Sequence, residues 1–125
     1  MLSILLCNCS NEAQIDLSTS YFKIQINNNG FITSMKNTTI KPAQEFSPAD
    51  KHSPLMCLFD AENNVIYEPT SASFNNTDSI ITLSYENQSV ANILTEVKEK
   101  YFKFTLLSLS SREKIDEIQW GSYQT

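Results

Sequence analysis

Apolar and polar residues alternate along much of this chain, most regularly over residues 79–108. Three segments in this stretch (79–85, 90–97 and 101–108) share the pattern. The residues predicted on their buried face are Ile81, Leu83, Tyr85, Ala91, Ile93, Val97, Phe102, Phe104 and Leu106. Alternation with a period of two is typical of half-buried strands. We therefore predict three antiparallel strands joined by two short turns, with an apolar face toward a core and a Lys/Glu/Thr face toward water.

A second alternating pattern lies nearer the N-terminus. Residues 21–27 and 31–36 flank an Asn-Asn-Gly turn at residues 28–30, which is typical of a tight hairpin. The first of these strands is predicted to bury Phe22, Ile24 and Ile26. In the second, Phe31, Thr33 and Met35 are predicted to lie on the opposite face from Ile32 and Ser34.

The segments between these patterns carry weaker signals. Residues 14–20 are interpreted as a polar lead-in, and residues 37–53 as a long loop without periodicity. Residues 55–59 are apolar on both sides, which predicts a strand covered on both faces. A turn then leads to a strand at residues 65–68 that Pro69 ends, and residues 71–74 are predicted as a short edge strand.

The C-terminal residues 110–125 fit two structures. Ser110 and Glu113 have the spacing of a helix capping box, and Ile115 and Ile118 are three apart, as in a helix. Ile118 and Trp120 also alternate with polar residues, as in a strand. We favour a turn followed by a strand at residues 115–120. The expected fold is all-β, an antiparallel β-sandwich of about seven to eight short strands formed by residues 13–125 as a single domain.

Composition agrees with one folded domain. The chain has 125 residues, of which 41% are hydrophobic and 18% charged. A net charge of −5 and scattered basic residues argue against nucleic acid as a partner, because phosphate binding needs clustered Lys and Arg. The one basic cluster, formed by Lys98, Lys100 and Lys103, is interleaved with glutamates and is interpreted as a solvated strand face.

Asparagine stands at most of the predicted turns, whereas the chain has only two glycines. The asparagines concerned are Asn27, Asn28, Asn29, Asn63, Asn64, Asn75, Asn76 and Asn87. Asparagine tolerates a positive φ and hydrogen-bonds its neighbouring backbone. We expect it to close these turns in place of glycine.

Residues 1–12 are interpreted as a lipoprotein signal remnant and tether. An apolar run meets Leu-Cys-Asn-Cys at residues 6–9, which resembles the lipobox of bacterial lipoproteins, and Cys9 is the predicted lipidation site. The run is shorter than the usual 7–15 apolar residues, and no basic residue precedes it. The alternative is an apolar start without a signal. No apolar run approaches the roughly 20 residues of a membrane-spanning helix.

Few residues carry catalytic potential. His52 is the single histidine and is interpreted as an exposed loop residue, although a general base or metal ligand is the alternative. The pairs Asp60/Glu62 and Asp116/Glu117 are the closest carboxylates, and turns or polar strand faces are predicted for both. Glycoside hydrolysis needs two carboxyls that face each other. We expect no catalytic residue, metal or cofactor, and no disulfide, with Cys57 a small buried residue.

Aromatic residues are the remaining candidates for binding. Those proposed as glycan or partner contacts are Tyr21, Tyr67, Tyr101, Trp120 and Tyr123. Aromatic rings stack on sugars, but packing between neighbouring strands is the commoner use of them.

Three segments together resemble one protein family. They are Phe22-Lys23-Ile24 with Asn29 through Met35, Ser53-Pro54-Leu55-Met56 with Val65 through Pro69, and Ile118-Gln119-Trp120-Gly121-Ser122-Tyr123. These resemble the opening hairpins and the exit of the N-terminal β-sandwich modules of secreted bacterial glycoside hydrolases. The resemblance implies a galactose-mutarotase-like supersandwich that packs on a downstream catalytic domain. The family's catalytic carboxylates lie in that later domain, and no position here matches them.

Three functions are therefore considered. The first is a non-catalytic module of a lipid-anchored, carbohydrate-active protein, whose partners are a downstream catalytic domain or carbohydrate and, through the lipid, a membrane. The second is a self-standing surface lipoprotein that binds a glycan or a protein, and the third is a small hydrolase. The first two place the chain in the bacterial cell envelope, lipid-anchored in the periplasm or at the cell surface. The chain alone is not expected to be an enzyme, although a full-length parent protein could be a glycoside hydrolase.

Overall fold

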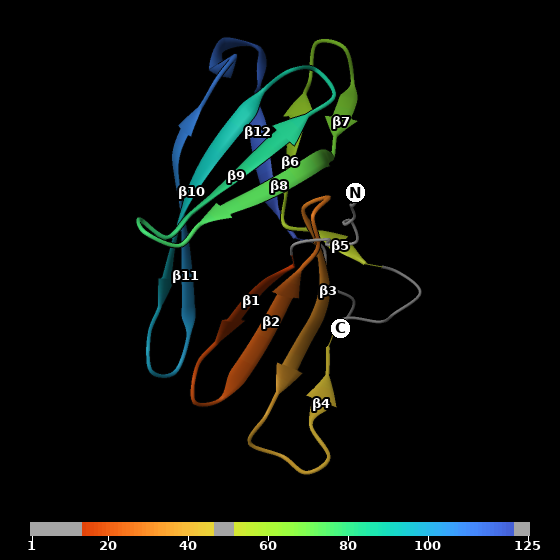
Figure 1. Cartoon of the computed structure of the whole chain (residues 1–125). Coiled ribbons are helices and arrows are strands. Elements are labelled where there is room, and N and C mark those ends of the chain that lie inside the picture. The colour runs from red at the N-terminus through yellow and green to blue at the C-terminus, as the bar shows by residue number, and fades with distance from the viewer. Residues whose placement is uncertain (1–13, 47–51, 122–125) are drawn as a thin grey trace, which may run out of the picture.

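The computed structural model describes residues 14–46 and 52–121, and these residues form a nearly all-β fold with no α-helix. A four-stranded antiparallel sheet faces a three-stranded sheet, and a five-stranded sheet adjoins them (Figure 1). The expected all-β, sandwich-like class is thus confirmed. Within the described ranges, no helix is long and apolar enough to cross a membrane.

The described residues contain twelve strands, more than the expected seven to eight. The strands are β1 (Ile15–Ser18), β2 (Phe22–Ile26), β3 (Phe31–Asn37), β4 (Gln44–Glu45), β5 (Ser53–Pro54), β6 (Met56–Asp60), β7 (Val65–Tyr67), β8 (Pro69–Asn75), β9 (Ile80–Tyr85), β10 (Val90–Val97), β11 (Phe102–Leu109) and β12 (Glu117–Trp120). One 3₁₀ turn, η2 (Arg112–Lys114), precedes β12. The difference in number comes mainly from β1, β4 and β5, which lie in segments predicted as lead-in and loop.

The four-stranded sheet has the order β11-β10-β9-β8 and confirms the three predicted strands. In β9 every second residue is buried, and β10 shows the same pattern as far as Thr95, as the alternation predicts. Val97 is an exception: it ends β10 beside the exposed turn and is exposed, and Thr95 takes the last buried position. The polar face is solvated as expected, with Lys98 and Glu96 forming an ion pair of 3.1 Å.

A β-bulge interrupts β11 at Leu107. Ile93 of β10 lies opposite Leu106, whereas the preceding residue, Asn92, lies opposite Ser108, so Leu107 has no partner. The extra residue resets the alternation, so that Leu106 and Leu109 both pack against the core while Leu107 is 51% exposed. A period of two alone does not predict this shift.

The N-terminal hairpin is confirmed as β2 and β3, but its second strand does not alternate strictly. A bulge places Ile26 opposite Ile32 and Ile24 opposite Met35, so both partners in β3 contribute to the core. The expected polar lead-in is also wrong in part. Residues Ile15–Ser18 form β1, which pairs with β2 and buries two aliphatic side chains.

The segment predicted as a long loop folds back on the edge of β3. Strand β4 pairs with β3 at Lys36 and Asn37, and β5 pairs with it at the other end. Glu45 of β4 accepts hydrogen bonds from the Ser34 hydroxyl (2.6 Å) and the Met35 backbone N–H (2.7 Å). These contacts hold the segment against the sheet edge. The sequence did not predict this pairing, because the segment has no periodicity. Residues 47–51 lie outside the described ranges.

The three-stranded sheet has the order β12-β6-β7 and settles the ambiguity at the C-terminal end. Strand β12 pairs with β6 after the short 3₁₀ turn, so the predicted strand is confirmed and its start is two residues later than expected. Consecutive residues Met56, Cys57 and Leu58 of β6 are buried, as predicted for a strand covered on both faces. The Tyr85 hydroxyl crosses from the opposite sheet and donates to the Met56 carbonyl at 2.8 Å.

Asparagine closes turns largely through its side chain. The carboxamide oxygen of Asn27 accepts from Asn29 and Phe31, and Asn75 and Asn87 each accept from the residue two positions later. Asn64 adopts a positive φ of 53°, as expected. Among the residues that the structure describes, the other non-glycine residues with positive φ are Ser79, Gln88 and Ser111, which the sequence pattern did not indicate.

Candidate interaction surface

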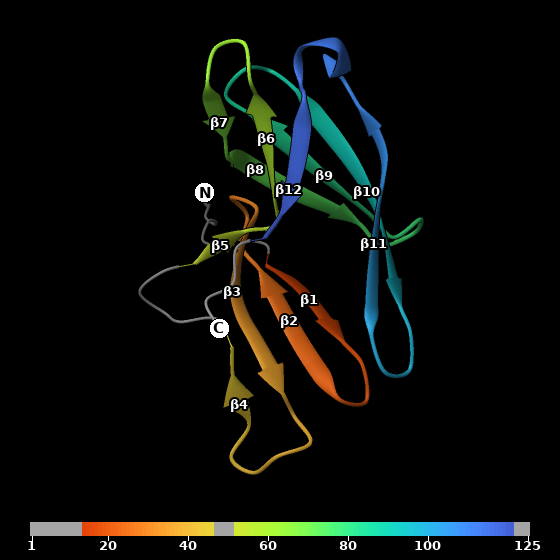
Figure 2. The ribbon, with the colours of Figure 1, turned by 180° about the vertical axis from the view of Figure 1, so that it is seen from behind.

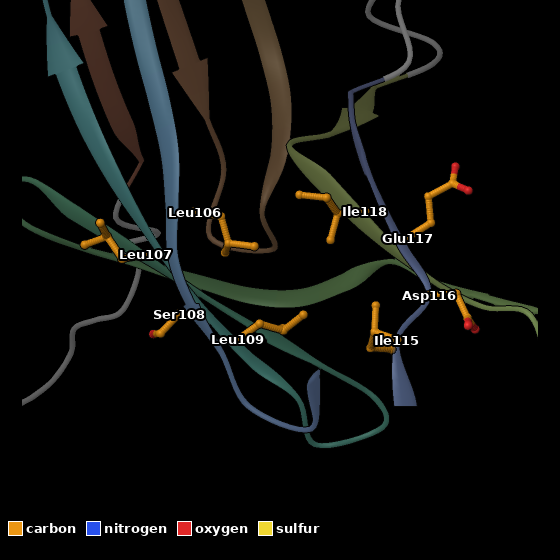
Figure 3. A pocket seen from close by; sticks show the side chains of 8 residues that line it. All are labelled: Leu106, Leu107, Ser108, Leu109, Ile115, Asp116, Glu117 and Ile118. Carbon is orange, nitrogen blue, oxygen red and sulfur yellow. The ribbon is translucent and has the colours of Figure 1, made fainter. Parts of the chain in front are cut away.

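A groove lies between β11 and β12, at one open margin of the sandwich (Figure 3). It has a volume of about 300 Å³ and is lined by Leu106, Leu107, Ser108, Leu109, Ile115, Asp116, Glu117 and Ile118. Figure 3 shows Leu106 and Leu109 directed from β11 toward Ile115 and Ile118 on the opposite wall. The walls of the groove are therefore aliphatic.

The groove exists because the two sheets differ in width. In Figures 1 and 2, β11 forms the outer margin of the four-stranded sheet, and β12 lies closer to the middle of the sandwich. The three-stranded sheet ends at β12, so part of β11 has no strand above it. The inward side chains of β11 are consequently only half-buried.

An aromatic pair lies beside these walls. Trp120 of β12 stacks on Phe104 of β11, with ring centroids 6.5 Å apart and an interplanar angle of 25°. Trp120 keeps 40% of its surface exposed. The proposed contact at Trp120 is thus accessible, but one use of its ring is to join the two sheets.

The acidic residues of the groove lie on its outer side. Figure 3 shows the carboxylates of Asp116 and Glu117 directed away from the aliphatic walls. Asp116 accepts a hydrogen bond of 2.7 Å from the Ala61 backbone N–H. The Glu117 carboxylate has neither a hydrogen bond nor an ion pair with any described residue. The Glu117 side chain therefore lies next to the aliphatic walls of the groove without a described partner.

The predicted tyrosine contacts do not form one platform. Tyr67 lies on β7, beside a separate cavity that Glu68 and Glu86 also line, and Tyr101 is 56% exposed in the turn before β11. Tyr123 lies outside the described residues. The four aromatic positions that the structure describes are thus not brought together by the fold.

Tyr21 lines a shallow cleft with Lys100. The Lys100 ammonium lies 6.0 Å from the centre of the Tyr21 ring, and the cleft of about 370 Å³ also includes Asn37 and Thr39. The carboxamide oxygen of Asn37 accepts from the Thr39 backbone N–H at 3.0 Å. An aromatic face, a cation and an amide thus surround one concave surface.

The candidate carboxylates Asp60 and Asp116 accept hydrogen bonds in the turn between β6 and β7. Asn63 donates to Asp60 from its side-chain amide and from its backbone N–H, and these bonds lower the pKa of the Asp60 carboxyl. Asp116 caps the same turn through Ala61. His52 is exposed before β5. Within residues 14–46 and 52–121, no three His, Cys, Asp or Glu side chains come close enough to hold a metal ion.

Cys57 is buried as predicted, and its thiol is protonated at neutral pH. Burial, with a smaller effect of the Glu68 carboxylate, raises the pKa of the thiol to about 11. The side chain lies on the outer face of the three-stranded sheet, next to Phe59, Ile66 and Gln119. A thiolate there lacks any cation to stabilise it, so the residue acts as a small apolar side chain.

We predict that iodoacetamide alkylates Cys57 about a hundredfold more slowly at pH 8 than a free thiol, because the thiolate fraction falls about tenfold for each unit of pKa. The measurement is the alkylation rate by mass spectrometry in a variant with Cys7→Ser and Cys9→Ser. Urea should restore the ordinary rate. A fast rate in the folded state would contradict the burial of this thiol.

Comparisons with family descriptions, curated proteins and solved structures find no match for this chain.

Sequence reasoning did not find the groove. The clearest indication of the groove in the sequence is the Leu106-Leu107 pair, which breaks the alternation within an otherwise regular strand. Two apolar residues in succession at a strand edge indicate a bulge or an additional apolar surface. The position of Ile115 just before β12 gave no such signal, because it fitted a helix as well as a strand.

Proposed function

We propose that this chain is the non-catalytic N-terminal β-sandwich module of a lipid-anchored, carbohydrate-active protein, and that it packs on a downstream catalytic domain. The observation that carries the proposal is the groove between β11 and β12, a concave surface of mixed polarity with aliphatic walls at the margin of the sandwich. Exposed aliphatic side chains in a concave surface are suited to contact with another protein, and the proposal assigns this groove that use. The resemblance of the three sequence segments supplies the carbohydrate-active context and the envelope location.

The use of the carboxylates supports a non-catalytic role. Glycoside hydrolysis requires two carboxyl groups about 5–10 Å apart across the sugar, with the pKa of one raised. Here Glu45 binds the edge of β3, and Asp60 and Asp116 cap one turn. The pKa of Asp60 is lowered, which is opposite to the requirement for a general acid.

The alternative is a self-standing surface lipoprotein that binds a glycan or a protein. The cleft formed by Tyr21, Asn37 and Lys100 favours it, because an aromatic ring beside hydrogen-bond donors is a common way to hold a sugar. The cleft is shallow and has one aromatic wall. We therefore rank this function second.

We predict that the purified chain hydrolyses no aryl glycoside and binds simple sugars no more tightly than about 1 mM. The measurement is release of the aryl group across a substrate panel, with glycan binding followed by calorimetry. Turnover that disappears when Glu45→Ala and Asp50→Ala are combined would overturn the module proposal. Tight glycan binding that Tyr21→Ala abolishes and Tyr101→Ala leaves intact would establish the alternative.

A further inference from the structure

The groove lies at the position that a further strand of the three-stranded sheet would occupy next to β12. Strand β12 ends the three-stranded sheet, and β11 extends beyond it in the opposite layer (Figures 1 and 2). One additional strand beside β12 would lie over β11 and cover Leu106 and Leu109. Neighbouring strands are about 4.8 Å apart, so an added strand would occupy the position next to β12 on the side of the groove.

The backbone of β12 supplies the hydrogen-bonding groups for such a strand. The Gly121 N–H donates to the Leu55 carbonyl at 3.0 Å, which continues the register of β12 with β6. Because backbone groups alternate in direction along an antiparallel strand, those of Ile118 and Trp120 point away from β6. Among the described residues, no strand pairs with this outer edge. An extended polypeptide matches donors and acceptors at this spacing.

The opposite wall is less suited to strand pairing. The bulge at Leu107 interrupts the edge of β11, and Lys103 stands exposed on its outer face. Bulges and edge lysines are features by which sheet edges avoid pairing. The edge of β12 has neither among Glu117–Trp120. We therefore assign the pairing to β12.

The charge beside the groove determines the chemistry of the partner. Cross-strand neighbours point to the same face of a sheet, so a residue beside Ile118 enters the aliphatic groove and a residue beside Glu117 lies on the outer face. The Glu117 carboxylate has no described partner, and the chain carries a net charge of −5. The complementary strand is apolar at one set of alternate positions and basic at the other.

We propose that the groove binds an extended peptide strand of alternating apolar and basic residues, which adds to the edge of β12. The inference rests on the proposed function as a non-catalytic module and identifies the kind of segment that its partner presents. The two can fail separately. Hydrolysis by the chain would overturn the module role, whereas a failure of peptide binding overturns only strand addition.

The probe is a blocked synthetic peptide of about eight residues that alternates valine and lysine, the length of an ordinary strand. Titration into the ¹⁵N-labelled chain should shift the resonances of residues around the groove, and hydrogen exchange of the Ile118 and Trp120 amides should slow at least tenfold. A peptide with N-methylated valines lacks the donors of one edge and should not bind. Binding of the methylated peptide with equal affinity would overturn the proposal.

The charge requirement is tested with Glu117→Lys, a change at an exposed position that does not disturb the core. This variant should bind the lysine peptide roughly fivefold more weakly and a valine–glutamate peptide more tightly, because cross-strand ion pairs contribute about 0.2–1 kcal/mol. Glu62→Lys changes the net charge equally in the β6–β7 turn and should leave both affinities unchanged. An equal effect of both variants would overturn the assigned position.

Two further outcomes would also overturn the proposal. One is exchange protection at the β11 amides of Phe102, Phe104 and Leu106 without protection at Ile118, since the partner would then join the other sheet. The other is a concentration-dependent dimer without peptide that Glu117→Lys disrupts, since the occupant would then be a second copy of the chain. Sedimentation velocity over a range of concentrations distinguishes the dimer from a peptide complex.

Discussion

Replacing Gly30 with alanine is expected to destabilise the fold by about 2–5 kcal/mol, a large part of the stability of a domain of this size. Gly30 has a φ of +89°, which alanine adopts only with strain of about 1–2 kcal/mol. A Cβ at this position would also lie 2.9 Å from Cβ and Cγ of Pro69 and 3.1 Å from Cδ2 of Leu83. Overpacking of this kind adds about 1–3 kcal/mol.

The loss of stability in Gly30→Ala should involve more of the structure than the turn itself. Its carbonyl accepts from the Leu55 N–H at 2.9 Å, and the two residues that a Cβ would contact belong to β8 and β9. The turn therefore lies where the sheets meet, and it cannot move without disturbing them. The measurement is the free energy of unfolding from urea denaturation.

Asn64→Ala is the matched control for this effect. Asn64 also has a positive φ, 53°, but it lies exposed in the β6–β7 turn. Alanine there should cost only the backbone strain of about 1 kcal/mol. Equal losses in the two variants would show that strain alone, and not the contact with Pro69 and Leu83, determines the effect at Gly30.

The strands that the sequence predicts most clearly are those whose burial is one-sided. In β9 and β10 one face meets the core and the other meets water, so the period of two is visible in the residues. The same is true of β2, where Ile24 and Ile26 are buried. These strands are predictable because their alternation is a local pattern that is visible in the sequence.

The elements that escaped prediction depend on pairing with distant residues. Strand β4 has only two residues, both exposed, and exists because Glu45 and its backbone bind the edge of β3. No local periodicity signals such a contact. The bulge at Leu107 is similar, because its position depends on the register between two strands and not on the composition of either one.

The candidate surface was the least predictable feature. The aromatic residues chosen from the sequence were identified by type, whereas the groove consists of aliphatic residues from two sheets that end at different positions. Sheet width follows from the strand order, which the sequence alone does not reveal. Of the predicted contacts that the structure describes, Trp120 lies beside this groove, because it belongs to β12.

Cys9→Ser is expected to move the full-length product almost completely from the detergent-extracted membrane fraction to the aqueous fraction, when the chain is expressed in a bacterium that lipidates its envelope proteins. Acyl chains contribute about 0.8 kcal/mol for each buried CH₂ group, and anchoring by two chains is stable whereas a protein without them has no comparable membrane affinity. Cys9 ends the Leu-Cys-Asn-Cys motif that follows the apolar run at residues 2–6, and it precedes a polar segment, as the acylated cysteine of a lipoprotein does. Fractionation followed by immunoblotting gives the distribution.

Cys7→Ser is the matched control, since it removes a thiol two positions away in the same short segment. This variant should remain in the membrane fraction and keep the mass of the acylated product. If Cys7→Ser releases the protein and Cys9→Ser does not, the lipid is on Cys7 and the assignment within the motif is wrong. If neither change alters the distribution, the lipid anchor itself is refuted, and with it the location of the module in the cell envelope.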